Sequence, residues 1–177
     1  MRFLASALVF LISTASLLQG VAMQTVWYPE TEVRQSIVFG ETSRYALLEP
    51  ELLASYADSV NLRISGAGDI RLISGRESDL VAWLDGANWS KPSLRVNPEL
   101  ETSTLIGRNY RGDNPPNGVS GFDVFMSESV EQRSLRQTVD YQPGIAYLIA
   151  SDGVNPVPSR LEMTWQIEPP TVASDPF

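Results

Sequence analysis

Strict alternation between apolar and polar residues in two short stretches constrains the fold of this chain most. In "SVNLRIS" (59–65), Val60, Leu62 and Ile64 alternate with polar residues, and "RLEMTWQI" (160–167) repeats the pattern over its whole length. A period of two puts neighbouring side chains on opposite faces of a β-strand, whereas a helical face recurs about every 3.6 residues. We therefore predict two half-buried strands whose apolar faces turn toward a core.

Three further segments read as strands. "GFDVFM" places Phe122, Val124 and Met126 on one face. "DLVAWL" (79–84) and "GIAYLIA" (144–150) are apolar on both faces, which is typical of central strands covered on both sides. One stretch differs: "LEPELLASYADS" has a proline where a first helical turn tolerates it, and it predicts one or two turns of helix within 50–57.

Turn residues separate these segments at short intervals: Gly66-Ala67-Gly68-Asp69, Ser74-Gly75, Asp85-Gly86, Gln142-Pro143-Gly144 and Asp152-Gly153. Short strands with frequent turns indicate an all-β fold, and we predict a single antiparallel β-sandwich, Ig-like or jelly-roll-like, with one short helix. "LRISGAGDIRLISG" (62–75) resembles the Ser-Gly-x-Gly-Asp turns of some bacterial adhesin-like β-solenoid repeats. It occurs once, and a simple hairpin explains it better than a solenoid does.

The N-terminal residues have the features of a secretory signal peptide. Met1-Arg2 precedes an apolar run at 3–18, and Gly20-Val21-Ala22 offers the small residues that a signal peptidase recognises. We predict a signal peptide at 1–22, a sandwich domain at 23–168 and a proline-rich tail at 169–177. The mature protein would then be periplasmic, cell-surface or secreted, with no membrane insertion after cleavage.

Composition excludes several chemistries. The chain has no cysteine and no histidine, so thiolate catalysis, zinc–thiolate sites and the usual histidine base are absent. Its net charge is −8, and loss of Arg2 makes it more negative still. Nucleic acid and anionic membranes are disfavoured partners, because the average electrostatic force is repulsive. No nucleophile motif or phosphate-binding glycine loop is present either, so we expect no enzymatic activity and no cofactor.

The polar run "GRNYRGDNPPNGVSGFD" (107–123) has three interpretations besides that of a solvated connection. The first is Arg111-Gly112-Asp113 as an adhesion tripeptide. The second is a weak calcium site, with oxygen ligands from Asp113, Asn114, Asn117 and Asp123, although the spacing departs from the calcium-loop motif. The third is a partner-binding loop with contacts from Arg108, Tyr110 and Arg111.

Two aromatic features offer other candidate binding residues. Trp89 follows a Gly-Ala-Asn turn, and an exposed indole beside polar groups could stack on a sugar ring; the alternative is that Trp89 closes the end of the sandwich. Trp27 and Tyr28 precede Pro29 within 24–35, a stretch that suggests an edge strand or an arm lying on a neighbour.

These features lead to three hypotheses of function. The first is an exported, non-catalytic module that binds a protein partner in an envelope or surface complex. The second is a structural surface subunit or adhesin that assembles by strand addition. The third is a carbohydrate-binding module, with Trp89 as the stacking residue.

Overall fold

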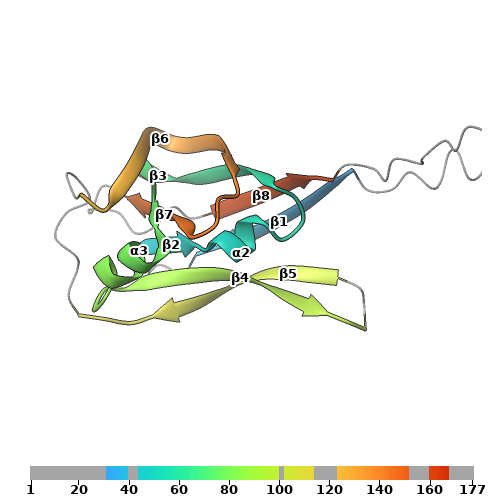
Figure 1. The fold of residues 1–177 in the computed structure, drawn as a ribbon, viewed down its shortest axis with the longest axis horizontal. Coiled ribbons are helices and arrows are strands. Elements are labelled where there is room, and N and C mark those ends of the chain that lie inside the picture. The colour runs from blue at the N-terminus through green and yellow to red at the C-terminus, as the bar shows by residue number, and fades with distance from the viewer. Residues whose placement is uncertain (1–30, 40–43, 100–101, 114–122, 152–159, 168–177) are drawn as a thin grey trace, which may run out of the picture. The chain divides into compact units, whose positions relative to one another are not determined.

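The computed structural model describes residues 31–39, 44–99, 102–113, 123–151 and 160–167. Apart from Thr31, these residues belong to one compact unit, Glu32–Ile167 (Figure 1). The predicted signal peptide (1–22), the predicted tail (169–177), Trp27 and Tyr28 lie outside the described residues. The elements are β1 (Glu32–Val38), β2 (Tyr45–Leu48), α2 (Pro50–Leu53), β3 (Ser59–Arg76), α3 (Glu77–Trp83), β4 (Trp89–Asn97), β5 (Thr102–Tyr110), β6 (Phe125–Asp140), β7 (Ile145–Ser151) and β8 (Arg160–Gln166).

β3 is the central strand of the sheet. β6 pairs with it antiparallel over nearly its full length. β8 and β7 share the other edge of β3, because β8 pairs with residues 60–65 and β7 with residues 70–76. β1 in turn pairs with β8, and β2 pairs with β7, both antiparallel. β8 and β7 thus form one interrupted strand next to β3, and β1 and β2 form a second interrupted strand beyond them.

A line of irregularities crosses these strands near their middle. The pairing of β3 with β6 jumps from Ser65 to Asp69, and Gly68 within the jump has a φ of 87°. On β6, Arg133 lies opposite the jump with a φ of 63°. β7 and β8 meet β3 on either side of the same level. Because bulges bend strands and increase their twist, this line curves the sheet.

The predicted turns within 62–75 are therefore wrong. The Ser-Gly-Ala-Gly-Asp stretch is a bulge in one continuous strand, neither a hairpin nor a solenoid turn, and Ser74 and Gly75 remain paired within β3. A bulge and a tight turn both use the positive φ that glycine permits, so composition alone does not separate them. Gly75 leaves room for the neighbouring backbone, because an added Cβ would lie 2.8 Å from the Val124 carbonyl oxygen.

The β4–β5 hairpin brings the sheet close to a barrel. β4 joins the rest of the sheet through a short parallel pairing with β2, and Figure 1 shows the hairpin below the other strands. β1 and β5 stand at the two ends of the strand order. Between them, the Gln35 amide donates a hydrogen bond of 3.0 Å to the Ser103 carbonyl, which links β1 to β5 where the sheet nearly closes. The Ser103 hydroxyl also contacts the hydroxyl of Tyr56, in the segment that follows α2.

The prediction of a mainly β chain is confirmed, but the antiparallel sandwich is not found. The strands form one mixed sheet of eight strands that is nearly closed into a barrel. After the segment that follows β2, β4 runs in the same direction as β2, so this pair is parallel. Alternation identifies the faces of a strand and is silent on its pairing partners, so it could not separate the two architectures.

The alternation in 59–65 and 160–167 is confirmed in detail. On β8, Leu161, Met163 and Trp165 are fully buried, and Val60, Leu62 and Ile64 on β3 face the same core. β7 is covered on both faces, as predicted for 144–150, because its side chains alternate between this core and a second apolar cluster. The predicted helix is present but shorter, at Pro50–Leu53.

The predicted strand at 79–84 is wrong, since these residues lie in or next to helix α3. Leu80 and Leu84 are both fully buried, and their spacing of four residues puts them on one helical face. Glu77 and Asp79 occupy the first turn, where acidic side chains are favourable. The turn at Asp85-Gly86 is as predicted, with a φ of 76° at Gly86.

No helix in the described ranges is long and apolar enough to cross a membrane.

The strand predicted from "GFDVFM" is displaced. β6 begins at Phe125 and continues to Asp140, and Phe122 lies outside the described residues. Met126, on the apolar face of that pattern, is 63% exposed. On β6, the odd-numbered residues Leu135 and Val139 face the core, and both lie in the second half of the strand.

Candidate functional site

The outer face of the sheet has two unlike halves. Over β2, β7 and the second half of β3, the outward side chains are apolar and pack against α3; this second core includes Leu47, Ile73, Leu80 and Leu148. Over β1, β8 and the first half of β3, the outward side chains are polar except Val38 and mostly exposed. A potential ligand can therefore reach the polar half.

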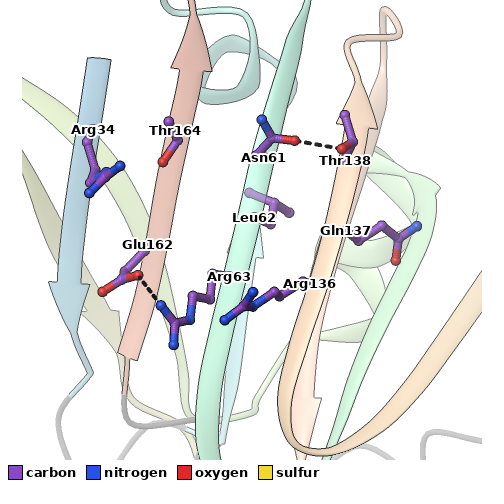
Figure 2. A pocket seen from close by; sticks show the side chains of 9 residues that line it. All are labelled: Arg34, Asn61, Leu62, Arg63, Arg136, Gln137, Thr138, Glu162 and Thr164. Atoms are coloured by element: carbon purple, nitrogen blue, oxygen red, sulfur yellow. Dashed lines mark hydrogen bonds and ion pairs between the residues drawn. The ribbon is translucent and has the colours of Figure 1, made fainter. Parts of the chain in front are cut away.

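An open hollow of about 420 Å³ lies on this polar half (Figure 2). Seven of its side chains come from four neighbouring strands, β1, β8, β3 and β6, and share one face because residues two apart on a strand point the same way. Leu62 and Gln137, which pair with each other between these residues, are on the opposite, core-facing side of the sheet. The lining residues are Arg34, Asn61, Leu62, Arg63, Arg136, Gln137, Thr138, Glu162 and Thr164.

Positive charge exceeds negative charge in the hollow. Arg63 Nη1 lies 3.7 Å from Glu162 Oε2, and the same carboxylate is 3.2 Å from Arg160 Nε. Arg34 pairs at 3.0 Å with Glu32 on its own strand. Within the described residues, Arg136 has no carboxylate at ion-pair distance. Exposed ion pairs of this kind contribute little free energy, so the guanidinium groups remain available to a ligand.

The neutral polar groups in the hollow can donate hydrogen bonds. Thr138 Oγ1 donates to Asn61 Oδ1 at 2.6 Å, which leaves the Asn61 amide nitrogen with two N–H groups to offer. Thr164 adds a hydroxyl. None of the lining residues is aromatic. This set of side chains suits an oxygen-rich anion better than an apolar or stacking ligand.

Two of the predicted contact residues are brought together elsewhere. Trp89 and Tyr110 lie opposite each other at the start of the β4–β5 pairing, and their rings stack with centroids 4.1 Å apart. Both are half-buried. Tyr110 thus covers one face of the indole that was predicted as a sugar platform, and neither residue lines the hollow.

The other loop candidates lie apart from the hollow. Arg108 is exposed on β5, and Arg111 and Asp113 are exposed just after it. Gly112 N–H donates to Asn88 Oδ1 at 3.0 Å, so the glycine of the Arg-Gly-Asp triplet packs on the preceding turn. Of the proposed calcium ligands, Asp113 and Asp123 are exposed, and Asn114 and Asn117 lie outside the described residues.

A carboxylate cluster absent from the sequence predictions lies at the N-terminal ends of α2 and α3. The side chains of Glu49, Glu51 and Glu77 approach within 4.8 Å of one another. Burial, followed by the charges of Glu51 and Glu49, raises the pKa of Glu77 above its ordinary value of 4.5. Such a cluster has the oxygen ligands that a divalent cation prefers, but Lys91 already pairs with Glu49, and exposed acidic groups commonly occur without an ion.

Sequence reasoning missed Arg34, Arg63 and Arg136 as site residues. The signal was present in part, because Arg63 lies on the polar face of "SVNLRIS". That alternation by itself identifies only which side of the strand faces the core. Nothing in the order of residues indicates that 34, 63 and 136 share one face, since this depends on which strands pair.

No known protein family and no curated protein matches this chain. Among solved structures, the chain is similar to hydroquinone 1,2-dioxygenase from Sphingomonas sp. TTNP3, solved with 4-hydroxybenzoate bound. The identity is 15% and the TM-score 0.32. The alignment covers 81% of this chain and 63% of the dioxygenase chain, less than two thirds of its length.

The comparison corrects the expectation that the chain is not an enzyme. The similar chain is an enzyme, and a β fold nearly closed into a barrel is compatible with catalysis, so the lack of familiar motifs was not sufficient ground for that expectation. A TM-score of 0.32 does not carry the dioxygenase's reaction or ligand over to this protein.

Proposed function

We propose that this protein is an exported binding module whose hollow receives an acidic segment of a protein partner, in the cell envelope or at the cell surface. The observation that supports this most directly is the gathering of Arg34, Arg63 and Arg136 at one hollow of a chain whose net charge is −8. Guanidinium groups bind carboxylates through paired hydrogen bonds, and charge complementarity selects partners. Export is inferred from the apolar run at 3–18.

The shape of the hollow favours an extended chain segment. It is open and crosses four adjacent strands, which at the usual strand spacing span about 14 Å. About four extended residues cover that length. Small-molecule sites are in general more enclosed and more apolar than this surface.

The chemistry of the lining favours a protein segment over a glycan. Sugar sites commonly stack an aromatic ring on the apolar face of the sugar, whereas the nine residues of the hollow include no aromatic side chain. Three arginines set beside the Asn61 amide and two threonine hydroxyls instead match a run of Asp and Glu side chains.

Affinity capture from the native envelope fraction tests this proposal. The bait is the wild-type mature chain, and the test variant carries Arg63→Glu and Arg136→Glu. A matched control carries Arg95→Glu and Arg108→Glu, two exposed arginines on β4 and β5. We expect one partner to be captured by the wild type and the control, to be lost with the hollow variant, and to be released as salt rises. A synthetic peptide of the partner's acidic segment should compete.

Two outcomes contradict the proposal. If the hollow variant, shown to be folded by circular dichroism, captures the same partner at the wild-type level, the hollow is not the docking surface. If the captured partner has no acidic segment that competes as a peptide, the ligand class is wrong.

A further inference from the structure

Arg63 and Arg136 lie directly opposite each other in the β3–β6 pairing. Both side chains project from the exposed outer face, and Figure 2 shows their guanidinium groups close to each other in the hollow. Directly opposed residues on antiparallel strands have Cβ atoms about 5 Å apart, and like charges in that arrangement are unfavourable. The free protein therefore carries a local electrostatic conflict.

The neighbouring pairs on the same face are complementary, which makes this conflict specific. Asn61 and Thr138, the next outward pair along β3 and β6, are hydrogen-bonded at 2.6 Å. Across the other edge of β3, Arg63 faces Glu162, and their ion pair is 3.7 Å long. The mismatch is thus confined to Arg136, whose positive charge no described carboxylate balances.

We propose that Arg63 and Arg136 form a two-arginine clamp for a single carboxylate group. One carboxylate placed between the two guanidinium groups offers each of them an oxygen edge, and it replaces their repulsion by two charge-assisted contacts. Glu162 holds Arg63 from the side away from Arg136, which leaves the side toward Arg136 for the ligand. The source of the carboxylate, an Asp or Glu side chain, rests on the proposed function.

Arginine and lysine carry the same charge, so replacing arginine with lysine distinguishes a bidentate arginine clamp from simple charge attraction. A lysine ammonium cannot present the planar fork of donors that a carboxylate accepts bidentately. The test is calorimetric binding of a hexaglutamate peptide at low salt to the wild type, Arg63→Lys, Arg136→Lys and a control variant, Arg95→Lys. We expect each hollow variant to bind at least about tenfold more weakly, the effect of losing one charge-assisted hydrogen bond, and the control to bind as the wild type does.

The free protein supplies a second readout. If Arg136 serves the ligand and not the fold, Arg136→Gln should leave the melting temperature equal or higher while abolishing the stabilisation that the peptide confers on the wild type. A lower melting temperature for Arg136→Gln, with peptide stabilisation retained, would mean that Arg136 has a structural role and would overturn the clamp.

Lysine variants that bind the peptide within about twofold of the wild type would reduce the site to charge attraction and overturn the clamp.

Two further probes, inorganic phosphate and trigalacturonate, identify the chemistry of the anion. Inorganic phosphate binding more tightly than the peptide would overturn the assignment to a carboxylate. Trigalacturonate binding more tightly, with the same arginine dependence, would support the clamp and overturn a protein segment as its ligand. If no probe binds the wild type, the clamp fails, and envelope capture still decides the proposed function separately.

Discussion

Trp89 and Tyr110 stack face to face across the β4–β5 pairing, with ring centroids 4.1 Å apart and ring planes 9° from parallel. Trp89 also packs against the second core beneath α3. The stack therefore ties the start of the hairpin to that core. Two residues considered separately as candidate ligand contacts thus have a structural relationship that supports the hairpin.

Replacing Tyr110 with alanine should destabilise the protein by about 1 kcal/mol beyond the loss of buried area, because an aromatic pair of this geometry contributes roughly that much. It should also expose the Trp89 indole and shift its fluorescence to longer wavelength. Urea unfolding and emission spectra measure the two effects. Tyr110→Phe keeps the ring and should behave as the wild type. An emission shift that persists in a Trp89→Phe background would show that another tryptophan reports it.

Substituting alanine for Gly112 should displace the Arg-Gly-Asp segment. A Cβ at this position would lie 2.0 Å from the Gly86 carbonyl oxygen and 2.8 Å from the Ala87 nitrogen, so the segment must move and the Gly112–Asn88 hydrogen bond must break. We expect a loss of about 1 kcal/mol of stability and shifted amide resonances at residues 86–88. Asn88→Ala removes the same bond without the clash and should shift fewer resonances. Unchanged amides in the glycine variant would contradict the close packing.

Replacing Glu77 with glutamine should stabilise the protein more at pH 7 than at pH 4. The pKa of Glu77 is raised in the folded state by burial and by the charges of Glu51 and Glu49, despite the opposing effect of Lys91. The folded protein therefore holds this proton more tightly than the unfolded chain does. The resulting stability is present below the unfolded pKa and is lost as pH rises through the folded pKa. Melting temperatures across this range measure the effect, with exposed Glu131→Gln as the control. An equal effect of Glu77→Gln at both pH values would contradict it.

Replacing Trp165 with phenylalanine should cost about 1–3 kcal/mol, since a buried acceptor loses its donor. The indole is fully buried, and its Nε1–H donates to the Leu53 carbonyl at 2.8 Å, which joins β8 to α2. Urea unfolding followed by circular dichroism gives the free-energy difference. The adjacent exposed residue offers a matched control, because Gln166→Ala should change stability by less than about 0.5 kcal/mol. Equal stabilities for the two variants would rule out the structural role of this bond.

The hollow illustrates where prediction from the sequence stopped. Arg63 could be placed on a solvent-facing strand position from its neighbours alone. Its opposition to Arg136 depends on a register between residues 73 positions apart in the sequence, and this register includes the jump between Ser65 and Asp69. A shift of one residue in that register would move Arg136 to the other face of the sheet. No local pattern carries that information.

Local chemistry determined the inward faces of 59–65 and 160–167, the double coverage of 144–150 and the helical turn at Pro50, because each depends on side chains within a few residues of one another. The tertiary structure decided the rest. It made 79–83 part of a helix because Leu80 and the C-cap residue Leu84 cover apolar strands from elsewhere in the chain. It made the Ser-Gly-Ala-Gly-Asp stretch a bulge because β6 continues alongside it. The near-barrel and the arginine hollow arise from strand pairing, whose free energy comes from residues far apart in the sequence.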